Sequence, residues 1–107
     1  MGLRLILCNC PPEHAAALGT QLVAEKLVAC VNIIEGVRSL YLWKGELVDE
    51  REHTLLAKTA EDRVAEVEAR IAELHPYEVP EIVVLEPHHA SDAYVQWVEE
   101  STRVQSS

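Results

Sequence analysis

The feature that most constrains this chain is the stretch from Ala29 to Thr59, ACVNIIEGVRSLYLWKGELVDEREHTLLAKT. It contains two extended runs of β-branched, aliphatic and aromatic residues, which suit the pleated, half-buried surface of a sheet. The runs meet at Lys44-Gly45, where the glycine can adopt the positive φ that a tight hairpin turn requires. Each arm would hold about 14 residues, roughly twice the usual strand. A domain of this size cannot cover such a ribbon alone, so the sequence predicts that its distal half lies against another subunit.

The composition limits the class of protein. The 107 residues predict a single domain, residues 1–107, which can bury one core without a metal or a disulfide. The formal net charge of -9 disfavours nucleic acid and anionic membranes as partners. Three cysteines do not form a disulfide framework and favour a reducing compartment. Since no apolar segment has the length of a membrane span or a signal peptide, we expect a cytoplasmic protein without membrane contact.

The rest of the chain predicts two further strands and three helices. The strands are Leu3–Cys10 and Glu81–Glu86, and the helices are Glu13–Lys26, the segment from Thr59 to His75, and a last helix capped by Ser91. The first six elements match the split β-α-β arrangement called ferredoxin-like, an α+β fold. Right-handed crossovers then give a four-stranded antiparallel sheet with two helices on one face. The other face stays bare in a monomer, which favours a homo-oligomer.

Five stretches of the sequence carry a family resemblance. They are EKLVACVNI (Glu25–Ile33), SLYLWKGEL (Ser39–Leu47), LLAKT (Leu55–Thr59), HPYEVPEIVVL (His75–Leu85) and YVQWV (Tyr94–Val98). On these stretches, which span almost the whole chain, the sequence resembles the CutA family, the divalent-cation-tolerance proteins. The resemblance implies a ferredoxin-like homotrimer whose extended hairpins interlock between subunits. It also implies a cytoplasmic protein linked to the tolerance of copper and other divalent metals, without an enzymatic activity.

The candidate metal ligands lie at one end of the predicted sheet. Cys8 and Cys10 form a C-x-C pair, and the period of a strand places both thiols on one face. Thiolates suit Cu(I) and Zn, whereas the alternative is that both are small apolar fillers. His75 ends the second helix, at the same end of the sheet, where it either binds metal or caps the helix. The resemblance implies copper at Cys8 and His75; the family's pattern can place a second His where this chain has Leu74, which leaves Cys10 as a substitute ligand.

Two ligand-binding hypotheses follow, and a third hypothesis is a purely structural or anchoring trimer. The first is a homotrimer that binds copper or another divalent cation, which it does not need for folding, with Tyr41, Leu42, Trp43 and Trp97 between subunits. The alternative is a PII-like regulatory trimer that binds a small molecule or a protein partner in a cleft between subunits. Cleft walls formed by Tyr41, Trp43, Tyr77 and Trp97 would favour this alternative. We expect no enzymatic activity, because the sequence lacks the GxSxG, HExxH, Walker and GxGxxG motifs.

Overall fold

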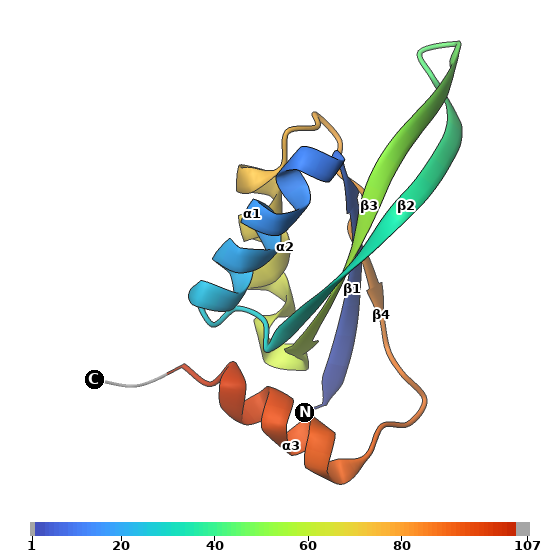
Figure 1. Cartoon of the computed structure of the whole chain (residues 1–107). Helices are drawn as coiled ribbons and strands as arrows, with labels where there is room; N and C mark the ends of the chain where they lie inside the picture. The colour runs from blue at the N-terminus through green and yellow to red at the C-terminus, as the bar shows by residue number, and fades with distance from the viewer. Residues whose placement is uncertain (1, 105–107) are drawn as a thin grey trace.

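The computed structural model describes residues 2–104 of the chain. Its elements are β1 (Leu3–Cys10), α1 (Pro12–Ala24), β2 (Cys30–Trp43), β3 (Glu46–Ala60), the 3-10 turn η1 (Glu61–Arg63), α2 (Val64–Leu74), β4 (Val83–Leu85) and α3 (Asp92–Ser101). The four strands form one antiparallel sheet in the order β2-β3-β1-β4, and α1 and α2 lie side by side on one face of it (Figure 1). The predicted α+β class and element order are confirmed, although β4 is shorter than the predicted strand.

The hairpin of β2 and β3 projects beyond the rest of the domain (Figure 1). Its strands contain 14 and 15 residues. They turn at Lys44 and Gly45, whose φ angles of 50° and 81° are those of a two-residue turn that matches the twist of the strands. One extra residue of β2 forms a bulge between Ile34 and Val37, where Gly36 has a φ of 75°. The predicted long ribbon and its turn are confirmed.

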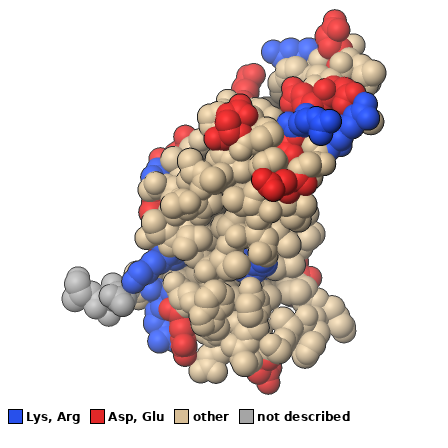
Figure 2. All heavy atoms as spheres, in the orientation of Figure 1, with Lys and Arg blue, Asp and Glu red and all other residues tan. Residues whose placement is uncertain are grey.

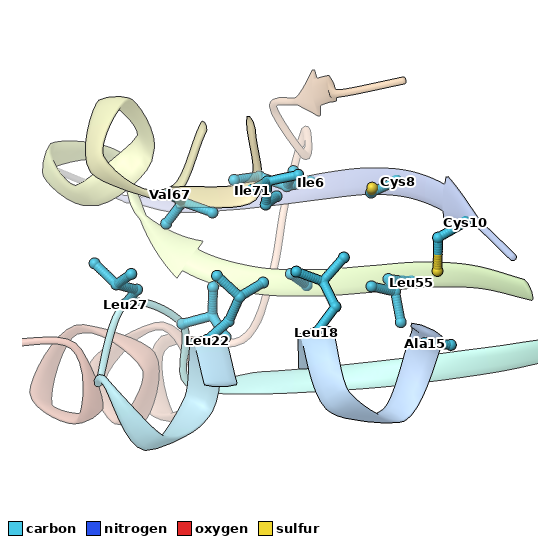
Figure 3. Packing of buried hydrophobic residues seen from close by; sticks show 12 residues of the cluster. Ile6, Cys8, Cys10, Ala15, Leu18, Leu22, Leu27, Leu55, Val67 and Ile71 are labelled. Atoms are coloured by element: carbon cyan, nitrogen blue, oxygen red, sulfur yellow. The ribbon is translucent and has the colours of Figure 1, made fainter. Parts of the chain in front are cut away.

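The core lies between the sheet and the two helices that cover it. Alternate residues of the strands pack against helix residues spaced three or four apart, because side chains on one face repeat about every two residues in a strand and about every 3.6 residues in a helix. Figure 3 shows this cluster, in which the fully buried side chains of the sheet and helices include Ile6, Cys8, Cys10, Leu55, Leu22, Val67 and Ile71. The core is therefore aliphatic, with two thiols among its members.

The last helix, α3, packs against β1 and β3 near the start of the chain (Figure 1). Ser91 caps it as predicted, since its side chain accepts a hydrogen bond from the backbone N–H of Tyr94. Val98 anchors the helix in the domain, whereas Trp97 remains 47% exposed beside the Tyr94 ring. Within residues 2–104, no helix combines the length and the apolar character needed to cross a membrane.

The projecting hairpin carries large apolar side chains with nothing packed over them. Leu42 and Leu47 near the turn are 71% and 75% exposed, and Leu40 is 64% exposed. Acidic and basic side chains gather on the same hairpin, while the body below it shows fewer charges on the face in view (Figure 2). This mixture of exposed apolar and charged side chains is typical of a surface that meets a protein partner.

Candidate functional site

The end of β1 and the end of α2 meet at one backbone carbonyl, that of Asn9. His75 Nε2 donates a hydrogen bond to this oxygen over 2.8 Å, and the Cys8 thiol contacts the same oxygen at 3.8 Å. Because both groups touch one atom, Cys8 Sγ and His75 Nε2 cannot be further apart than the sum of these two distances. The expectation that the topology brings Cys8 and His75 together is therefore confirmed.

The second ring nitrogen of His75 is also engaged. The backbone N–H of Tyr77 donates to His75 Nδ1 over 3.0 Å, and the two rings lie 4.7 Å apart between centroids. This pattern fits the tautomer that carries its proton on Nε2, with Nδ1 as acceptor. His75 is 7% exposed, so its ring ties the turn after α2 to the end of β1. It acts in the structure as a buried connector at the helix end.

The two thiols of the C-x-C pair are buried in the core. Cys8 and Cys10 are 1% and 0% exposed, and Figure 3 shows both sulfur atoms on the side of the sheet that faces the helices. Burial, together with smaller contributions from the neighbouring Cys10, Glu81 and Glu52, raises the pKa of the Cys8 thiol to about 12. Burial likewise raises the pKa of Cys10. Since the thiolate is the form that binds soft metals, neither cysteine is a ready ligand at neutral pH.

These residues do not form a preorganised copper site. Among residues 2–104, no group of three or more His, Cys, Asp and Glu side chains is placed to hold a metal ion. Copper at Cys8 and His75 would have to displace the thiol proton and at least one hydrogen bond of the ring. Leu74, where a second His was considered, is 36% exposed and adds no ligand. Metal binding by Cys8, His75 and Cys10 stays a prediction.

A hollow of about 750 Å³ lies between the hairpin and the segment that follows α2. Tyr41 and Trp43 of β2 and Tyr77 of the following segment supply its aromatic walls. Glu50 and Glu52 of β3 also line it. Three of the four aromatic residues expected around a ligand cleft thus meet here. The fourth, Trp97, is not part of the lining, because it lies on α3.

The polar groups of the hollow form a connected network. The Tyr77 hydroxyl donates to Glu52 Oε2 over 2.8 Å and lies 3.4 Å from Glu50 Oε2. Glu52 is 4% exposed, so this hydrogen bond satisfies one oxygen of a buried carboxylate. Partial burial and the neighbouring Glu50 and Glu52 raise the pKa of Tyr41, and burial with the Glu52 hydrogen bond raises that of Tyr77. No local pattern in the sequence joins Glu50 and Glu52 to Tyr77.

The comparisons with known proteins cover nearly the whole chain. The family model for the CutA1 divalent ion tolerance protein matches residues 4–101. The chain belongs to this family. Its CutA relative from Thermus thermophilus, a divalent-cation tolerance protein, is 40% identical over 99 residues, which cover 92% of this chain and 96% of that protein.

Solved CutA structures share the fold as well as the sequence. The PII-like protein CutA from Nostoc sp. PCC 7120 in apo form is 40% identical, with a TM-score of 0.91 over 95% of this chain and 99% of that one. A CutA from Archaeoglobus fulgidus, described as a periplasmic divalent cation tolerance protein, is 26% identical, with a TM-score of 0.90 over 94% of this chain and 99% of that one. The projecting hairpin and the turn after α2 are therefore parts of the CutA1 fold.

Proposed function

We propose that this protein acts as a cytoplasmic homotrimer in the tolerance of divalent cations, copper among them, and that it catalyses no reaction. Its membership in the CutA1 family supports the link to divalent cations. Three free thiols support a reducing compartment, although the relative from Archaeoglobus fulgidus is described as periplasmic.

The exposed hairpin is the observation that supports the proposed trimer. Leu40, Leu42 and Leu47 are all more than 60% exposed on a two-stranded ribbon that extends past the core. An isolated two-stranded ribbon has little stability of its own in water. Burial of these side chains against neighbouring copies would stabilise the ribbon and remove an apolar patch from solvent. Closed rings are the common form of such homo-oligomers.

For copper, we propose binding through Cys8 with help from His75 and Cys10. The contact that Cys8 and His75 make with the same Asn9 carbonyl supports this assignment, because a modest local shift would let both reach one ion. A thiolate and an imidazole are good ligands for the soft, reduced Cu(I) ion. The buried thiol must first lose its proton, so the apparent affinity should fall as the pH falls.

A titration of reduced protein with Cu(I) tests this proposal. Cys8→Ser is expected to remove most of the binding, and His75→Ala to weaken it by about tenfold or more. Cys30→Ser is the control, since it removes a thiol at the start of β2 that the proposed site does not include. Equal Cu(I) affinity in the wild type and Cys8→Ser would refute the assignment. Circular dichroism spectra of the variants would show whether each one keeps the fold.

The hollow favours a second candidate function, a regulatory trimer that binds a small molecule. Tyr41, Trp43 and Tyr77 meet in a concave space within the size range of small-molecule sites. The relative from Nostoc is described as a PII-like protein, which supports the comparison with regulatory trimers. In this candidate the chemistry of the walls determines the class of ligand.

A further inference from the structure

The hollow beside the hairpin carries negative charge with no basic residue in its walls. Four carboxylates line it, those of Glu50, Glu52, Glu78 and Glu81, and its lining contains no Lys, Arg or His. Within residues 2–104, none of the four takes part in an ion pair. Glu52 gives the strongest reason to expect a cation in the hollow, because only 4% of this residue is exposed. A buried carboxylate without an opposite charge is unfavourable, so a cation from outside the chain would be stabilised there.

The aromatic walls add to this preference for a cation. Tyr41, Trp43 and Tyr77 line the same space as the carboxylates. The faces of aromatic rings attract ammonium groups and also pack against methylene groups. Trp43 already makes one contact of this type, since Lys44 Nζ lies 5.7 Å from the centre of its ring. Together, rings and carboxylates suit a ligand with an aliphatic body and charged ends.

The size of the hollow argues for an organic cation over a metal ion. Its volume of about 750 Å³ greatly exceeds that of a single ion. The carboxylates are also spread out, because no three acidic, His or Cys side chains among residues 2–104 are placed to share a metal. Glu50 and Glu52 lie beside the Tyr77 hydroxyl, while Glu78 and Glu81 belong to the segment after α2. Separate carboxylates fit a ligand with more than one ammonium group.

We propose that this hollow, which in the proposed trimer lies at a boundary between subunits, binds a linear aliphatic polyamine. One ammonium group would lie at Glu52 and Glu50, beside the Tyr77 hydroxyl. The methylene chain would pack on Trp43 and Tyr41, and a second ammonium group would reach Glu78 or Glu81. The proposal rests on the second candidate function, ligand binding in the hollow, and specifies its ligand. It is independent of copper binding at Cys8.

Calorimetric titration of the assembled, full-length protein with spermidine tests the proposal. We expect saturable binding with one spermidine per chain. Glu52→Gln should weaken it at least about tenfold, because the amide keeps the shape and an acceptor for Tyr77 but removes the charge. Glu68→Gln is the matched control, since it removes the same charge from an exposed position on α2, outside the hollow. The spermidine affinity of Glu68→Gln should stay within about twofold of that of the wild type. This result would separate local recognition from general attraction to an acidic protein.

Two further probes test separately whether the hollow binds a ligand at all and whether that ligand must be a polyamine. Neutral 1,6-hexanediol resembles the aliphatic body without the charge, and Mg²⁺ supplies a compact multivalent charge without the aliphatic body. Neither should compete with spermidine when present at the same concentration as spermidine. Equal losses in Glu52→Gln and Glu68→Gln, or competition by Mg²⁺, would overturn the proposal. Glu50→Gln, at an exposed position, gives a second readout if Glu52→Gln does not fold. Absence of spermidine binding combined with hexanediol binding would reject the polyamine but keep a ligand site in the hollow, whereas binding of neither would reject both.

Discussion

Trp43→Asp is expected to convert the proposed homotrimer into smaller species at micromolar concentration. Trp43 ends β2 beside the turn and is 43% exposed in the single chain, next to the more exposed Leu42 and Leu47. In the proposed trimer this part of the hairpin lies between subunits. The substitution removes a large aromatic contact and places a carboxylate in an apolar surface, at a cost on the order of several kcal/mol.

Static light scattering measures this effect directly. The wild type should show the mass of three chains, and Trp43→Asp a lower mass that rises with protein concentration. Val104→Asp is the control, because it makes the same apolar-to-acidic change at a residue that is 66% exposed and lies outside the hairpin. Its mass should equal that of the wild type. A wild type with the mass of one chain, or a Trp43→Asp variant that stays trimeric, would contradict the proposed assembly.

Cys8 is expected to resist alkylation in the folded protein. At pH 8, a thiol with a pKa of about 12 has roughly a thousandth of the thiolate of one at the ordinary value of 9.0. Since Cys8 is also 1% exposed, iodoacetamide should modify it at least about a hundred times more slowly than a free thiol. Partly buried Cys30, whose side chain lies 4.0 Å from Lys58 Nζ, provides an internal comparison.

Mass spectrometry of the labelled peptides would give the rate at each cysteine. Folded protein should show label at Cys30 well before Cys8, and denatured protein should show all three cysteines modified at similar rates. Comparable rates at Cys8 and Cys30 in the folded protein would show that the thiol is accessible. The raised pKa also affects stability: as the pH rises above about 9, the unfolded chain loses this proton first, so stability falls between pH 9 and 12.

Two features were predictable because local chemistry determines them. The turn at Lys44-Gly45 follows from the need for positive φ between two runs of strand-forming residues, and the structure places both residues at positive φ. The meeting of Cys8 and His75 follows from topology, because β1 and α2 end at the same end of the sheet. Neither inference requires knowledge of how individual side chains pack.

Other features depend on side-chain packing that the sequence pattern does not determine. The strand period places Cys8 and Cys10 on one face, but it does not say that the helices cover that face and raise the pKa of the thiols. The Tyr77–Glu52 hydrogen bond joins a segment after α2 to a strand far away in the sequence, and it depends on the path of the chain beyond Pro76. Trp97 shares the aromatic character of the hollow's walls, but its helix packs elsewhere.

The bulge in β2 determines which residues of the distal hairpin lie on each of its two faces. Thr54 and Val48 of β3 are both even-numbered, so they lie on the same face of the hairpin, and each residue of β2 lies on the face of its partner. Before the bulge, the partner on that face is the even-numbered Ile34, opposite Thr54. After the bulge, it is the odd-numbered Tyr41, opposite Val48. The bulge thus absorbs the extra residue, so that Tyr41 and Trp43 lie on the face of the hollow. Without it, strict alternation along the same strand would present Leu40 and Leu42 on that face and exchange an aromatic wall for an aliphatic one. Loss of one residue at the bulge would instead remove the irregularity and keep Tyr41 opposite Val48, so the distal hairpin tolerates a deletion there without losing its aromatic wall.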